Sequence, residues 1–285
     1  MRVTLTMSTT GTLSFIPRDE LYQREKPYTL KFNPPTNLAK SNIKGLIQDV
    51  TLEDVRGRKD RFTIEDNGFE IVVLPETLAY HDFEDETKIK QVYLPQIAQL
   101  LMDMLGASRV QIFEHLVRRR HISFPIATGE VYQHYQPTTT AHIDMTQGWA
   151  RKMAGRLNHR SGIHELPSQS YQFVNVWKPL RGPIQDWPLA LCNPATVSED
   201  STIAGDIVFE DMEMENTLLH YDNEQKWYYL SDQKPDEAWI FVQGDNRSGI
   251  EHKCVPHTSF SHRDYTGGSL PRESIEVRAL VFYDT

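Results

Sequence analysis

Short runs of aromatic and β-branched residues dominate the chain from about residue 108 onward, and turn residues separate most of them. The runs cover residues 108–119, 130–135, 170–178, 188–193, 205–211, 227–231, 237–244 and 274–284. Strands of this length and spacing favour an antiparallel sandwich or barrel over alternating β and α units. The sequence therefore predicts a mainly β fold with flanking helices.

The first part of the chain carries weaker strand patterns at residues 4–16, 49–57 and 68–76. The one clear helix lies within 84–107, where Ile97, Leu100, Leu101 and Met104 recur at helical spacing. Pro95 suits its first turn and Gly106 its C-terminal cap. Residues 145–168 are expected to be irregular or a short helix. No shift in composition marks a linker, so we expect one domain over 1–285, with a less certain sheet extension at 1–84 and a helix plus β core at 85–285.

The net charge and the cysteine content limit the partners and the compartment. The formal charge is −9 and the pI about 5.7, which argues against nucleic acid and anionic membranes as partners. No apolar run reaches membrane-spanning length, and the N-terminus lacks a signal-peptide core. With only Cys192 and Cys254, reduced thiols are expected. These features predict a soluble, intracellular protein. We expect it to be cytoplasmic, as a monomer or homodimer.

The sequence "TTTAHIDMTQGWA" contains the pattern H-x-D at His142 and Asp144. Side chains at i and i+2 of an extended segment point to the same face, so the imidazole and the carboxylate converge. Two ligands hold a metal poorly, and a second histidine from elsewhere would complete the set that non-haem Fe(II) oxygenases use. The chain contains eleven histidines, so the pattern alone also fits ordinary polar residues at a strand end.

The C-terminal stretch adds an arginine pattern. Arg272, Ser274 and Arg278 share one face of the predicted final strand, and an arginine fork beside a hydroxyl suits a carboxylate. The alternative is an ion pair with Glu273 or Glu276. The arginines at 118–120, by contrast, are expected at a solvated strand end.

Residues Phe173, Asn175 and Trp177 share one face of the run "YQFVNVWKP". An apolar wall with one amide suits either a core strand or a pocket that binds a small organic substrate. The two interpretations are nearly balanced, and we expect a substrate-binding role.

The order of these motifs resembles that of the Fe(II)/2-oxoglutarate-dependent oxygenase superfamily, with H-x-D first, then a distal His and then an Arg. The stretches "NVWKPLRGPIQDWPLALCN", "PHTSF" and "RESIEVRALVFY" resemble its fungal and bacterial hydroxylase/desaturase group, which includes a gibberellin desaturase and a cephamycin-pathway methyltransferase component. The resemblance covers roughly residues 85–284.

The resemblance implies a double-stranded β-helix, a cupin-like jelly-roll, with Fe(II), 2-oxoglutarate and O2 as cofactor and co-substrates. It implies His142, Asp144 and His257 as iron ligands, with His252 as the rival for the third position. Arg272 and Ser274 would bind the far carboxylate of 2-oxoglutarate, with Arg278 in a supporting role. The substrate would be a small natural product that is hydroxylated, desaturated or cyclised at a C–H bond.

Two other functions fit the same residues. A metal-dependent hydrolase could use H-x-D without the arginine site, and a non-catalytic jelly-roll module could keep the motifs as structure alone.

Overall fold

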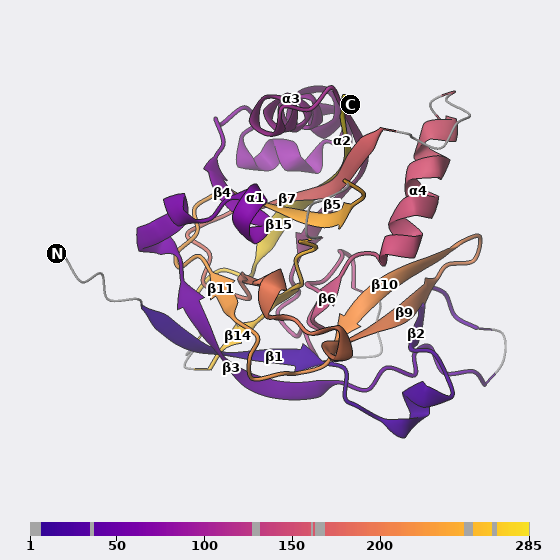
Figure 1. The fold of residues 1–285 in the computed structure, drawn as a ribbon. Helices are drawn as coiled ribbons and strands as arrows, with labels where there is room; N and C mark the ends of the chain where they lie inside the picture. Colours follow the sequence, from indigo (N-terminus) through magenta and orange to yellow (C-terminus); the bar gives the residue numbers. More distant parts are fainter. Residues whose placement is uncertain are drawn as a thin grey trace.

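The computed structural model describes residues 7–34, 37–126, 132–160, 162, 169–247, 253–263 and 267–284. The chain is mainly β, as predicted, and its strands form two sheets (Figure 1). The larger sheet has the order β14-β1-β3-β11-β8-β13-β6-β10-β9-β2, and the smaller has the order β4-β12-β7-β15-β5. Among the described residues, no helix is long and apolar enough to cross a membrane.

The larger sheet contains β1 (Ser8–Phe15), β2 (Tyr28–Leu30), β3 (Leu46–Asp54), β6 (His142–Ile143), β8 (Leu189–Cys192), β9 (Thr202–Val208), β10 (Glu213–Leu219), β11 (Trp227–Tyr229), β13 (His257–Ser259) and β14 (Ser261–His262). The smaller contains β4 (Phe69–Val73), β5 (Arg109–Arg119), β7 (Ser170–Pro179), β12 (Glu237–Asp245) and β15 (Glu273–Tyr283). Strands β1 and β3 pair with each other in the larger sheet, and β4 pairs with β12 at one edge of the smaller. The predicted boundary between 84 and 85 stays a prediction.

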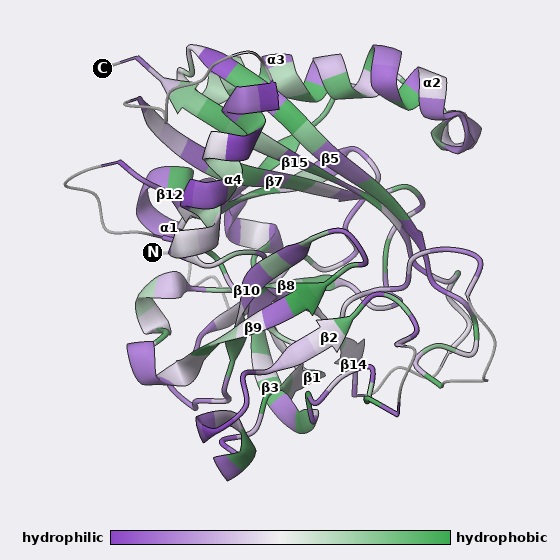
Figure 2. Ribbon diagram, turned by 90° about the vertical axis from the view of Figure 1, so that its right-hand side faces the viewer, coloured by the Kyte–Doolittle hydropathy of each residue, from purple (hydrophilic) through white to green (hydrophobic). Residues whose placement is uncertain are grey.

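The helical segments are α1 (Ile64–Asn67), α2 (Glu86–Lys88), the π-helical η4 (Ile89–Tyr93), α3 (Leu94–Leu105) and α4 (Gln147–Arg160). Short 3-10 segments are η1 (Glu20–Gln23), η2 (Arg56–Arg61), η3 (Tyr80–Glu84), η5 (Pro194–Thr196) and η6 (Glu199–Ser201). Figure 2 shows α2 and α3 following one another end to end along the outer side of the smaller sheet.

The helix predicted within 84–107 is confirmed as α2, η4 and α3 in succession. Pro95 lies in the first turn of α3 and has no amide hydrogen for the carbonyl four residues earlier, which explains the wider π turn before it. Gly106 ends α3 with a φ of 60°, in the left-handed region that glycine adopts without strain. Ile97 and Leu101 are buried against the outer face of the smaller sheet.

The alternation along β7 separates two environments. Val174 and Val176 face outward into the apolar cluster beneath the helices. Trp177 faces the opposite way and packs with Leu191 and Phe241 in the core between the two sheets. Side chains on the inner face of β7 are thereby placed between the sheets, where a site can be enclosed.

One local prediction was wrong. Residues 132–135 of the predicted strand 130–135 form no strand, and Tyr135 makes only an isolated bridge to Arg118. The segment 145–168, predicted as irregular or a short helix, contains the helix α4, whose buried residues Ala150, Ala154 and Leu157 follow helical spacing. The strands predicted at 108–119, 170–178 and 274–284 are confirmed as β5, β7 and β15.

Candidate metal centre

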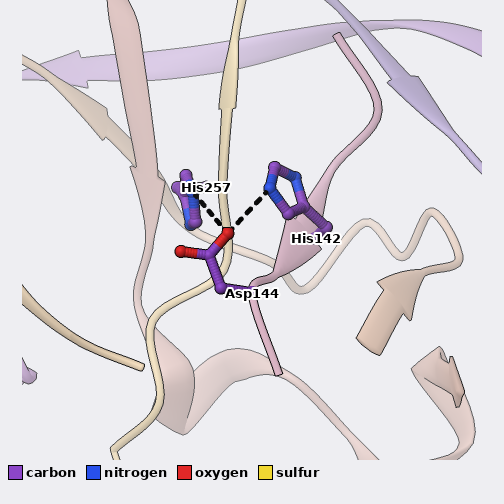
Figure 3. Close-up of side chains that lie close together, drawn as sticks. All are labelled: His142, Asp144 and His257. Carbon is purple, nitrogen blue, oxygen red and sulfur yellow. Dashed lines mark ion pairs between the residues drawn. The ribbon is translucent and has the colours of Figure 1, made fainter. Parts of the chain in front are cut away.

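The structure brings His142, Asp144 and His257 together between the two sheets, although residues far apart in the sequence supply them (Figure 3). His142 lies on β6 and His257 on β13, and the two residues are direct partners in the antiparallel pairing of these strands. Asp144 directly follows β6. One ligand atom from each residue lies within 4.8 Å of the others, and all three residues are buried.

Both imidazoles are oriented by backbone carbonyls. His142 Nδ1 lies 2.8 Å from the Thr140 carbonyl and His257 Nδ1 lies 3.4 Å from the Val255 carbonyl. Because a carbonyl only accepts hydrogen bonds, each Nδ1 carries a proton, and Nε2 is the ring nitrogen that faces Asp144. The Nε2 atoms lie 3.4 Å and 3.9 Å from Asp144 Oδ1.

The protonation of this cluster suits a divalent cation. Burial and the neighbouring His142 lower the pKa of His257 to about 4, which leaves its imidazole neutral near pH 7. Burial alone would raise the pKa of Asp144, but Arg278 and the two histidines hold it well below its ordinary value. Two imidazoles and one carboxylate are a donor set that fits iron(II).

Three polar side chains fix the orientation of Asp144. Asn175 on β7 donates its amide to Oδ2 at 2.6 Å, and Arg278 on β15 donates to Oδ1 at 3.0 Å. Gln243 accepts the Asp144 backbone N–H at 2.7 Å. Such outer contacts hold a ligating carboxylate in one rotamer, so Asp144 is held from the smaller sheet while both histidines come from the larger.

Gln243 is a site residue that sequence reasoning missed. It lies where the pairing of β12 with β7 shifts register between Val242 and Gly244. Its side-chain amide donates to the carbonyls of Val242 and Val255, the second of which also faces His257 Nδ1. A bulge re-aims one side chain, and a regular strand pattern gives no signal for it.

Arg278 is engaged by carboxylates rather than left for an anionic ligand. Its guanidinium pairs with Glu276 at 2.8 Å and Glu114 at 2.6 Å, in addition to Asp144. The alternative to an anion site, an ion pair with Glu276, therefore forms for Arg278. The supporting role predicted for Arg278 toward 2-oxoglutarate stays a prediction. Burial opposes the charge on Arg278, but the three carboxylates outweigh it and raise the pKa.

Arg272 is the contrasting case, because it is only 4% exposed and no described carboxylate pairs with its guanidinium. It donates to the Trp187 carbonyl at 2.8 Å and to Ser274 Oγ at 3.3 Å. The guanidinium carbon lies 4.8 Å from the ring centre of Trp177. Burial, with Arg118 adding to it, lowers the pKa of Arg272 to about 9, so it stays cationic near neutral pH.

The prediction of a solvated end for residues 118–120 was wrong for its first and last arginine. Arg118 is directly opposite Ser274 in the pairing of β5 with β15, and it lines the same cavity as Arg272, His142 and His257. Arg120 forms a buried ion pair with Asp186 at 2.6 Å. Cross-strand pairing, which the sequence does not display, brings both side chains inward.

The three residues predicted to bind substrate are all buried on the inner face of β7. The Asn175 amide donates a hydrogen bond to Asp144, and the Trp177 ring lies against the Arg272 guanidinium. Phe173 packs edge-on against Phe113 in the cluster that includes α4. Their substrate-binding role stays a prediction. The rival ligand His252 lies outside the described residues.

Comparison with known proteins places the chain in one family. Residues 13–282 match the family model described as "Oxidoreductase/YMDC permease-like domain". The Fe(II)/2-oxoglutarate-dependent dioxygenase nvfI of Aspergillus novofumigatus is 28% identical over 93% of this chain and 91% of its own length. The alpha-ketoglutarate-dependent dioxygenase tstK of Talaromyces stipitatus is 29% identical over 82% of this chain and 84% of its own.

A solved structure gives the same result for the fold. The iron and alpha-ketoglutarate-dependent endoperoxidase NvfI superposes with a TM-score of 0.83 at 25% identity, over 98% of this chain and 99% of that one. The predicted jelly-roll is thereby confirmed. The chain belongs to the oxidoreductase family of this model and, within it, to the Fe(II)/2-oxoglutarate-dependent oxygenases.

Proposed function

We propose that the chain oxidises a C–H bond of a small natural product, with His142, Asp144 and His257 as the iron ligands. The observation that carries this proposal is the convergence of their ligand atoms within 4.8 Å in a buried site. Iron(II) bound there, with 2-oxoglutarate and oxygen, would supply the oxidising chemistry. The dioxygenase names of the relatives support the reaction class.

The protein's own residues would position the reactants. The two histidines present Nε2 lone pairs, and Asn175, Arg278 and Gln243 hold Asp144 in place. Three ligands on one side of a metal leave room opposite them for small molecules. The buried position of all three ligands limits the access of water.

We propose Arg272, Ser274 and Arg118 as the site for the far carboxylate of 2-oxoglutarate. Arg278 is already neutralised by its carboxylate partners, whereas Arg272 is a buried cation without a described carboxylate partner. Glu276, which lines the same cavity, pairs with Arg278. Two further arginines and a hydroxyl therefore supply positive charge and donors for an anion.

The decisive experiment measures oxygen-dependent conversion of 2-oxoglutarate to succinate with added Fe(II). We expect wild type to turn over and His142→Ala to lose both turnover and tight iron binding. His81→Ala is the matched control, because the His81 side chain is 78% exposed and remote from the cluster. Retained turnover in His142→Ala would refute the ligand assignment.

The co-substrate site has its own test. Arg272→Ala should raise the Kd for 2-oxoglutarate at least about tenfold, because a charge-assisted pair is lost, while iron affinity changes little. Arg272→Lys should be intermediate, since it keeps the charge without the planar fork. Equal loss of iron and 2-oxoglutarate binding would contradict the assigned role. A metal-dependent hydrolase would respond to neither 2-oxoglutarate nor Arg272→Ala.

A further inference from the structure

A second cavity lies on the outer side of the smaller sheet, away from the metal centre. It has a volume of about 470 Å³, which is within the range of small-molecule sites. The turn after β4, the end of β7 and the η3 and η4 segments surround it. Lys178 lines it from β7, and because neighbouring strand residues face opposite sides, Lys178 points away from Trp177 and the metal centre.

The walls of this cavity are largely apolar. Leu74, Leu78, Phe83, Leu180 and Pro235 contribute to the lining. Its exposed rim carries charges of both signs, on Glu76, Lys234 and Asp236. Exposed charges of opposite sign screen one another, so they do not select a ligand strongly.

Two polar groups beneath the rim are incompletely satisfied. Lys178 Nζ donates to the Pro235 carbonyl at 3.0 Å and lies 5.0 Å from the Phe83 ring centre, but no described carboxylate pairs with it. Burial lowers the pKa of Lys178 to about 8, and the acidic groups of the rim only partly oppose this shift. The hydroxyl of Tyr93 is buried and has no hydrogen-bond partner among the described residues, although Tyr93 is only 2% exposed.

We propose that this cavity binds a small carboxylic acid with an apolar body, separately from the oxygenase site. The carboxylate would take the two remaining donors of the Lys178 ammonium. The alkyl or aromatic body of the ligand would cover the apolar wall. A single ammonium matches a monoanion, whereas a phosphate needs more donors.

Octanoate and its neutral counterpart 1-octanol are the probes, titrated by calorimetry in the presence of saturating 2-oxoglutarate and Mn(II). Octanoate should bind wild type, and Lys178→Met should weaken that binding about tenfold, as loss of a charge-assisted contact predicts. Binding of 1-octanol should be equal in wild type and Lys178→Met, which verifies that the variant keeps the cavity.

Lys234→Met is the matched control, because Lys234 lines the same cavity from its exposed rim and should contribute little. The proposal is overturned if octanoate fails to bind wild type, if Lys178→Met binds it as tightly as wild type, or if Lys234→Met costs as much as Lys178→Met. It is also overturned if 2-oxoglutarate displaces octanoate, since the probe would then occupy the metal centre. Loss of turnover in His142→Ala leaves this test unaffected.

Discussion

Replacement of Arg278 by methionine tests the charge balance around Asp144 in the metal-free protein. The Arg278 side chain is 13% exposed and pairs with Asp144, Glu276 and Glu114, of which the first two are buried. Methionine preserves most of the apolar stem but leaves two buried carboxylates without their cation. Removal of one partner from a buried ion pair costs about 3–5 kcal/mol, so we expect the free energy of unfolding to fall by that amount at pH 7.5.

The cost should depend on pH, and the sign follows from the pKa shifts. In wild type the pKa of Asp144 is held below its ordinary value despite burial, mainly by Arg278. The stabilisation by the ionised Asp144 is therefore present above the pKa that this carboxyl has in the unfolded chain. It is lost as the pH falls through the lower pKa of the folded state. Arg278→Met removes the largest charge that opposes burial, so the pKa of both carboxylates rises and they protonate more readily on mild acidification. The difference between variant and wild type should shrink between pH 7.5 and pH 5.

Urea denaturation in the presence of a chelator, at both pH values, measures these differences. Arg263→Met is the matched control, because Arg263 pairs with Asp49 at the surface, where the side chains are 63% and 47% exposed. An exposed pair contributes about 0–1 kcal/mol, and the control should show no comparable pH dependence. A loss below about 1 kcal/mol in Arg278→Met, or a loss that is the same at both pH values, would refute the reasoning.

Two further substitutions test the site and the backbone. Asn175→Ala removes the amide that holds Asp144 Oδ2, and we expect about tenfold weaker binding of Fe(II) in anaerobic titration; unchanged affinity would show that Arg278 and Gln243 position the carboxylate without Asn175. Gly68→Ala should lower the free energy of unfolding by more than about 1 kcal/mol, because Gly68 has a φ of +76° and an added Cβ would lie 2.4 Å from the Lys253 carbonyl. Gly57→Ala, where nothing lies within 4 Å, is the control, and equal effects of the two would contradict this account.

The local patterns of the sequence determined most of the strands and two of the three proposed metal ligands, His142 and Asp144. Alternation over a few residues depends only on backbone geometry, so it placed β5, β7 and β15 and gave His142 and Asp144 a common direction. Helical spacing with a proline and a glycine at its ends likewise placed α3. The pairing of His257 with these residues came from resemblance, because no local rule joins β13 to β6.

Only the tertiary structure decided which arginines near the site pair with carboxylates and which do not. Arg272 and Arg278 look alike in the sequence, yet one is buried without a described carboxylate partner and the other neutralises three carboxylates. Arg118 reaches the site through its position opposite Ser274. Gln243 reaches it through a bulge. The register between distant strands depends on packing summed over whole sheets, and a bulge shifts that register by one residue, so neither is encoded in any short stretch of the chain.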